Sequence, residues 1–105
     1  MYMTPSPCII VYCKDFCQYC TKAKDFLVKN KIPYHEVHLD TNDEEKYIQE
    51  RDDLIARAGG HHKTFPFIFV GKSFLGGYTD LIRAYDTLKL HELCTKEGQP
   101  LEYDF

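Results

Sequence analysis

The pair Cys17 and Cys20 constrains the fold of this chain more than any other feature, because of the segments on either side of it. The preceding segment, residues 8–13, is apolar and rich in β-branched residues, which predicts a buried strand. In the following segment Cys20, Ala23 and Leu27 recur at intervals of three and four, as on one face of an amphipathic helix. The pair is therefore expected at the junction between a strand and a helix.

The rest of the chain predicts the element order βαβα followed by ββα. Further strands are expected over residues 34–39, 65–70 and 73–75. The first helix is expected to end near Asn30. A second is expected to begin at Thr41 or Asn42 and to bury Tyr47, Ile48, Ile55 and Ala58. A third should follow Gly76-Gly77, and one more short helix is expected around Leu90 and Leu93. The first two strands should be parallel, joined by a right-handed helical crossover, and the last two should form a hairpin. The fold class expected is α/β: a four-stranded mixed sheet with helices on both faces.

Length and composition narrow the function classes. A chain of 105 residues makes one small domain, with its core at about 8–94 and a loose acidic tail over 95–105. The net charge of −3 disfavours nucleic acid and anionic lipid as partners, and no apolar run is long enough for a membrane span. Residues 1–7 lack the pattern of a secretory signal, so a cytoplasmic location is expected, where cysteines are more often catalytic or metal-binding than structural.

The position of the cysteine pair suits redox chemistry. Backbone N–H groups at a helix N-terminus lack partners within the helix, and the helix dipole is positive there. A Cys17 thiolate should be stabilised at this point, with Lys14 adding positive charge, so its pKa is expected below the ordinary value. Cys20, one helical turn further on, should be more buried and have the higher pKa, which suits a resolving thiol. A Cys-x-x-Cys pair near a βαβ pattern is typical of a thioredoxin-like redox motif.

Other interpretations of the cysteines stay open. Cys13 with the pair, plus His61 or His62, would make a zinc site, although no second Cys-x-x-Cys is present. The Cys-x₃-Cys-x₂-Cys spacing also matches the cluster ligands of radical-SAM enzymes, but those need a barrel of about twice this length. The simpler expectation is that Cys8 and Cys13 are packing residues in the strand. Cys94 is expected to be exposed and able to form intermolecular disulfides, and the two histidines to be solvated.

Three motifs in order resemble those of dithiol glutaredoxins, members of the thioredoxin-fold family. Lys14-x-x-Cys17-Gln18-Tyr19-Cys20 resembles K-x-x-C-P-Y-C, Lys63-Thr64-Phe65-Pro66 resembles a basic residue followed by T-V-P, and Gly76-Gly77-Tyr78-Thr79-Asp80-Leu81 resembles G-G-[CY]-[ST]-D-L. The similarity covers roughly residues 8–93. It implies a glutathione-disulfide oxidoreductase with Cys17 attacking and Cys20 resolving, and with glutathione as reducing cosubstrate.

The same resemblance implies the glutathione contacts. A cis Phe65–Pro66 bond would expose a backbone edge for the cysteinyl part. Thr79 and Asp80, at a helix N-terminus after Gly77, suit the γ-glutamyl carboxylate. Lys14 and Lys63 would face the glycyl carboxylate. The remaining expected contacts are Tyr19, Thr64 and Tyr78, with Arg51 as a further candidate.

One departure from the family pattern lies inside the motif. Gln18 stands where the family usually has proline, which is favoured at the first helical position. Family members that lack this proline sometimes hold a glutathione-ligated [2Fe–2S] cluster, so a cluster-carrying module remains an alternative to a metal-free enzyme. A thioredoxin-like electron donor recharged by a thioredoxin reductase is another alternative. A monomer is expected that acts on disulfide-containing or glutathionylated proteins, with ribonucleotide reductase as a candidate client.

Overall fold

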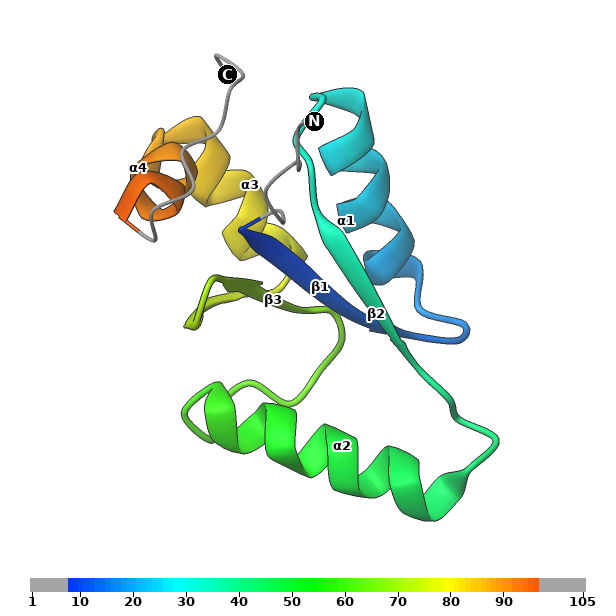
Figure 1. The fold of residues 1–105 in the computed structure, drawn as a ribbon. Coiled ribbons are helices and arrows are strands. Elements are labelled where there is room, and N and C mark those ends of the chain that lie inside the picture. The colour runs from blue at the N-terminus through cyan, green and yellow to red at the C-terminus, as the bar shows by residue number, and fades with distance from the viewer. Residues whose placement is uncertain (1–7, 97–105) are drawn as a thin grey trace, which may run out of the picture.

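The computed structural model describes residues 8–96, which form a four-stranded sheet with helices on both faces (Figure 1). The elements are β1 (Ile9–Lys14), α1 (Gln18–Lys29), β2 (His35–Leu39), α2 (Glu44–Arg57), β3 (Phe67–Val70), β4 (Ser73–Gly76), α3 (Tyr78–Asp86) and α4 (Lys89–Lys96). The predicted order of elements and the predicted α/β fold class are both confirmed. None of the helices within 8–96 is long and apolar enough to cross a bilayer.

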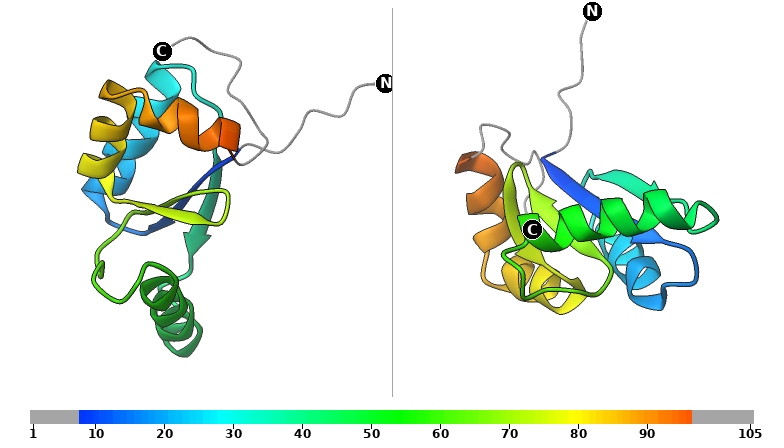
Figure 2. Two further views of the ribbon diagram at one scale, coloured as in Figure 1. Left: turned by 90° about the vertical axis from the view of Figure 1, so that its left-hand side faces the viewer. Right: turned by 90° about the horizontal axis from the view of Figure 1, so that it is seen from below.

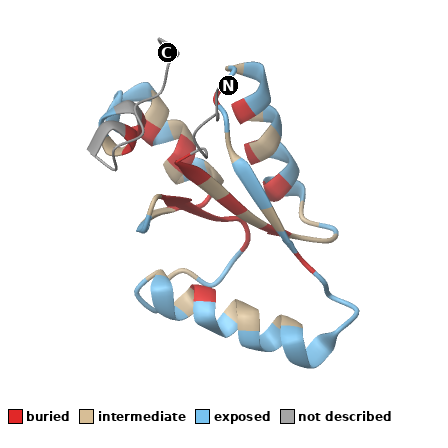
Figure 3. Cartoon of the chain, viewed as in Figure 1, coloured by how far each residue is buried: buried red, intermediate tan, exposed pale blue. Residues whose placement is uncertain are grey.

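The sheet has the strand order β2-β1-β3-β4. The pairing of β1 with β2 is parallel, and the pairs β1–β3 and β3–β4 are antiparallel, as the sequence predicts for a βαβ unit followed by a hairpin. The helices α1, α3 and α4 lie on one face of the sheet and α2 lies on the other (Figure 2). The two central strands therefore have covered faces, and every residue of β3 is buried (Figure 3).

The burial of α1 follows its sequence pattern. Its buried residues are Cys20, Ala23 and Leu27, the three that the helical spacing singles out. Asn30 caps the end of the helix: its side-chain amide and its backbone N–H both donate to the carbonyl oxygen of Phe26, at 2.8 and 3.1 Å. This confirms the predicted end of the helix near Asn30, and α1 packs against β1.

The burial of α2 differs from the prediction. Leu54 is the residue that this helix buries, whereas Ile48 is 38% exposed and Tyr47 and Ile55 are partly buried. The helix begins after Asp43, whose carboxylate accepts the N–H of Lys46 at 3.2 Å, so the cap is neither Thr41 nor Asn42. Two residues of α2, Tyr47 and Arg51, line the site described below.

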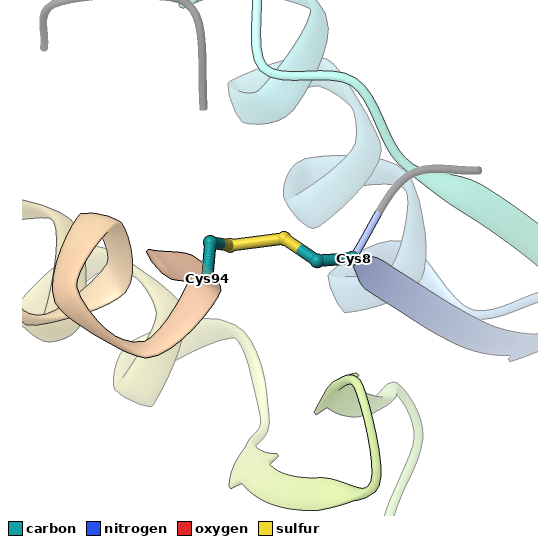
Figure 4. The surroundings of a disulfide bond; sticks show 2 residues. All are labelled: Cys8 and Cys94. Carbon is teal, nitrogen blue, oxygen red and sulfur yellow. A yellow bond between two sulfur atoms is a disulfide. The ribbon is translucent and has the colours of Figure 1, made fainter. Parts of the chain in front are cut away.

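Cys8 and Cys94 are joined in a disulfide, which corrects two expectations (Figure 4). Cys94 was expected to be exposed and available to other chains, but it is fully buried and its partner is in the same chain. Cys8 is buried as expected, but it is bonded rather than free. The bond ties the start of β1 to α4 across 86 residues of sequence. Cys13, Cys17 and Cys20 are free thiols. The expected loose tail, apart from the end of α4, lies outside the described residues.

Candidate active site: a dithiol beside a cationic groove

Cys17 occupies the N-cap of α1, where the strand-to-helix turn places its sulfur over the first backbone N–H groups. The N–H of Cys20 donates to the Sγ of Cys17 at 3.2 Å. The turn itself is made by Phe16, which has a positive φ of 58° and a fully exposed ring. Cys17 is half-buried and Cys20 is buried beneath it, so the structure gives the pair the predicted order of accessibility.

The pKa of the Cys17 thiol is raised, contrary to the expectation of a lowered value. Burial is the main cause, and the neighbouring Cys20 thiol adds to it. The two expected stabilising groups, the Cys20 N–H and Lys14, do lower the pKa, but they do not outweigh these effects. Cys20 has its pKa raised much further, first by interaction with the Cys13 thiol and then by burial, as expected for the resolving thiol. Cys17 is therefore the more readily ionised member of the pair.

We predict that alkylation of Cys17 by iodoacetamide becomes steadily faster from pH 7 to beyond pH 9. A raised pKa means that the thiolate fraction keeps growing about tenfold per pH unit until the pKa is reached. Removing the Lys14 charge in Lys14→Ala should shift the pH profile of Cys17 alkylation to higher pH, because that charge favours the thiolate. Rates measured by mass spectrometry on the peptide carrying Cys17 provide the check. A plateau reached below about pH 8 would contradict the raised pKa.

A cavity of about 420 Å³ lies directly beside Cys17. Three positively charged side chains line it: Lys14 from the end of β1, Arg51 from α2, and Lys63 from the loop before β3. The Nε of Arg51 is buried and has no hydrogen-bond partner among residues 8–96. Lys14 Nζ lies 5.6 Å from the centre of the Phe65 ring, which forms the floor between α2 and the loop. This half of the groove is suited to an anion.

A second cavity of about 320 Å³ continues the groove toward the N-terminus of α3. Tyr19, Thr64 and Phe65 line both cavities, so the two form one groove that passes Cys17. The other lining residues of this half are His62, Pro66, Gly77, Tyr78, Thr79 and Asp80. All the residues predicted to bind glutathione therefore lie along the groove, although their contacts with a ligand stay a prediction.

The start of α3 is held open by local backbone structure. Asp80 accepts the N–H of Gly77 at 3.0 Å, so this carboxylate is engaged within the protein. Gly76 has φ of 138°, and a side chain there would collide with the Asp80 carboxylate. The glycine pair therefore allows the turn that leads β4 into α3. Thr79, in the first turn of α3, lines the groove at this point. The N–H groups of a first helical turn lack acceptors within the helix, so a position beside them favours an anion.

His62 is a site residue that the sequence did not indicate. It was expected to be solvated, but its Nε2 donates to the carbonyl oxygen of Pro66 at 3.2 Å and its ring contacts Phe67 and Phe74. The Phe65–Pro66 bond is cis, as expected. Tyr47 was also missed as a lining residue, because it was expected only as a core residue of its helix; its ring stacks on that of Phe65, with 6.2 Å between the ring centres.

The sheet order, the helices on both faces and a dithiol at the start of α1 together define a thioredoxin-fold dithiol protein. Within residues 8–96 no group of three or more His, Cys, Asp or Glu side chains is arranged to hold a metal ion, so the zinc alternative gains no support.

Comparison with known proteins gives the family. The glutaredoxin family profile matches residues 9–75. Glutaredoxin-2, mitochondrial, of Pongo abelii is 33% identical over 100 residues, which are 91% of this chain and 60% of that protein. Glutaredoxin 1 of Rickettsia typhi is 34% identical over 92 residues, covering 88% of this chain and 82% of the relative. The chain belongs to the glutaredoxin family.

A solved structure agrees with this assignment. The solution structure of the dithiolic glutaredoxin 2-C-Grx1 from Trypanosoma brucei brucei has a TM-score of 0.69 and 26% identity, covering 84% of this chain and 87% of that one. The chain spans about half to three-fifths of the length of the mammalian mitochondrial relatives it matches.

Proposed function

We propose that this protein is a glutathione-dependent thiol–disulfide oxidoreductase that reduces protein disulfides and protein–glutathione mixed disulfides. The observation that carries the proposal is the position of Cys17: its half-buried sulfur lies at a helix N-cap and at the wall of a groove with three cations. A groove that is cationic at one end and has a helix N-terminus at the other matches glutathione, which has a carboxylate at each end. Membership of the glutaredoxin family supports the same conclusion.

In the proposed reaction with a glutathionylated protein, the Cys17 thiolate attacks the glutathione sulfur. The mixed disulfide breaks, the client leaves as a thiolate, and Cys17 becomes bonded to glutathione. A second glutathione thiolate then attacks the glutathione sulfur of this mixed disulfide, which releases glutathione disulfide and restores the Cys17 thiolate. With a protein disulfide, Cys17 first bonds to the client, and Cys20 attacks Cys17 to release the client and leave a Cys17–Cys20 disulfide. Glutathione then reduces this disulfide.

The groove suggests how glutathione would lie. The glycyl carboxylate would meet the positive charges of Lys14, Lys63 and Arg51. The γ-glutamyl carboxylate would accept the N–H groups of Thr79 and Asp80 at the start of α3. Between them, the cysteinyl part would lie along Phe65 with its sulfur toward Cys17. The rings of Tyr19 and Tyr78, 6.1 Å apart, would form the wall of the groove.

We predict that Lys14→Ala and Lys63→Ala each raise the KM for glutathione about three- to tenfold, because a charged hydrogen bond contributes about 0.7–1.4 kcal/mol in a partly exposed site. The test is reduction of a glutathionylated peptide, coupled through glutathione reductase to NADPH oxidation. The matched control is Lys72→Ala, since Lys72 is exposed in the β3–β4 turn and does not line the groove. An unchanged KM in both groove variants would contradict the placement of the glycyl carboxylate.

Two assays separate the proposed function from its alternatives. Replacing glutathione and its reductase by thioredoxin reductase should give no turnover, whereas efficient turnover would favour a thioredoxin-like donor. The visible absorption spectrum of anaerobically purified protein tests the cluster-carrying alternative, which Gln18 at the exposed start of α1 keeps relevant. A colourless, active protein agrees with the enzyme.

The proposal extends to partners and location in outline. We propose that the protein acts as a monomer in the cytoplasm on disulfide-containing or glutathionylated clients, with ribonucleotide reductase as one candidate. Some relatives are mitochondrial by name, so fractionation of the source cells is the appropriate test of location.

A further inference from the structure

Cys13 is a third free thiol, and the proposed reaction does not use it. It belongs to the alternating buried set of β1, with Ile9 and Val11, and is fully buried. Cys20 belongs to the buried face of α1, the helix that packs against β1. The two cysteines therefore project into the same layer of the core, one from the strand and one from the helix.

Cys20 has a cysteine neighbour on either side of it: Cys17 at the cap of its own helix and Cys13 on the buried face of β1. Both thiols affect the pKa of Cys20. Cys20 is 2% exposed and Cys13 is inaccessible, whereas Cys17 is half-buried at the groove. The resolving thiol thus has two neighbouring thiols, and one of them is out of reach of solvent.

From this arrangement we infer that Cys13 is a second disulfide partner of Cys20, so that oxidation can be transferred from the Cys17–Cys20 pair to a buried Cys13–Cys20 disulfide. The inference rests on the proposed dithiol chemistry of Cys17 and Cys20. In the transfer, the Cys13 thiolate attacks Cys20 Sγ and the Cys13–Cys20 bond forms. The Cys17–Cys20 bond breaks, and its electron pair leaves on Cys17 as a thiolate. The proton of Cys13 passes to solvent or to Cys17, and no net oxidation occurs.

In the reduced protein, interaction with the Cys20 thiol is the main cause that lowers the pKa of Cys13, and burial opposes it. Once Cys20 is bonded to Cys17 that interaction is lost, and the nearby charge of Lys24 is the effect that still favours the Cys13 thiolate, against burial and the charge of Glu36. Lys24 is held near the strand by Glu36, whose Oε2 it reaches at 3.1 Å.

The transfer would change what the oxidised protein can do. A Cys17–Cys20 disulfide removes the nucleophile from the groove until glutathione reduces it. A Cys13–Cys20 disulfide leaves Cys17 as a free thiol at the groove, so the oxidised protein would keep the single-cysteine reaction with glutathionylated clients. The buried bond would be reopened by the reverse attack of Cys17 on Cys20 rather than by glutathione itself.

Tryptic peptides of the oxidised protein distinguish the two disulfides. The protein is treated with glutathione disulfide, quenched with acid, alkylated under denaturing conditions and digested without reduction. Cleavage after Lys14 and Lys22 places Cys17 and Cys20 together on peptide 15–22, and Cys13 on peptide 1–14, which also carries Cys8 with its bond to Cys94. A Cys17–Cys20 bond is then internal to 15–22, whereas a Cys13–Cys20 bond links the two peptides. Fragment ions identify the cysteines that are joined.

We expect linked peptides that join Cys13 to Cys20, with Cys17 alkylated or glutathionylated in the same species. In Cys13→Ala the linked peptides should be lost while the internal disulfide of 15–22 remains. The fraction of Cys17 that can be alkylated in the oxidised protein should fall as well. In Cys17→Ser the linked peptides should not form, because glutathione disulfide reaches the two buried thiols only through Cys17.

Two outcomes would overturn the inference. Finding only the internal disulfide of 15–22 in the unmodified protein, with Cys13 fully alkylated, refutes it and leaves the proposed function intact. Finding no disulfide or glutathione on Cys17 at all refutes both.

Discussion

Cys17→Ser is expected to lower the rate of reduction of a glutathionylated peptide by more than about a hundredfold, because serine cannot form the thiolate that attacks the mixed disulfide. No other cysteine can take over this step. Cys13 is inaccessible and Cys20 is 2% exposed, so neither sulfur reaches a substrate in the groove. The coupled assay with glutathione reductase measures the loss, and circular dichroism checks that the variant is folded.

Cys20→Ser is the matched control, because it removes a neighbouring sulfur and preserves Cys17. It should retain reduction of the glutathionylated peptide, which needs only Cys17, and lose most of the reduction of a protein disulfide, which needs the resolving step. Equal losses in both assays for both variants would contradict the division of roles between the two cysteines.

Cys94→Ser is expected to lower the free energy of unfolding by about 2–5 kcal/mol, because the disulfide with Cys8 closes a loop of 86 residues and both sulfurs are buried. Urea unfolding of the unmodified protein and of the variant, both without reductant, gives the difference. Hydrogen exchange should show the loss most clearly in α4, which the bond ties to the start of β1.

Reduction provides the control for this effect. With a strong reductant that opens the bond, the unmodified protein should lose a similar amount of stability, and Cys94→Ser should change little. Identical unfolding curves for the oxidised protein and Cys94→Ser would show that the bond contributes nothing. Titration of five free thiols in the denatured, unreduced protein would show that the bond is absent.

Local sequence patterns were sufficient to predict most of the fold. The apolar run of β1, the spacing of Cys20, Ala23 and Leu27, and the closeness of β3 to β4 each depend on neighbouring residues only. The face of α2 was predicted only in part: Tyr47, Ile55 and Ala58 do pack partly buried against the core, but Leu54 was missed and Ile48 was wrongly included. Only packing against the sheet selects Leu54 and leaves Ile48 exposed.

The features that were missed depend on contacts between distant parts of the chain. The disulfide requires α4 to return to the start of β1, and no local pattern in either segment indicates this path. The raised pKa of Cys17 arises from how deeply the folded chain buries a residue whose local setting favours the thiolate. His62 enters the site because the chain folds its ring between Phe67 and Phe74, whereas its loop sequence alone indicates a solvated residue.

The most direct test of the central claim is the site of glutathione attachment in Cys20→Ser treated with glutathione disulfide. Without the resolving thiol, the mixed disulfide should accumulate. Mass spectrometry should then find one glutathione per molecule, located on Cys17. The yield of this glutathione adduct should fall when Lys14→Ala or Lys63→Ala is added to Cys20→Ser. Glutathione attached to another cysteine, or none attached at all, would contradict the account of Cys17 as the thiol that reacts with glutathione in this groove.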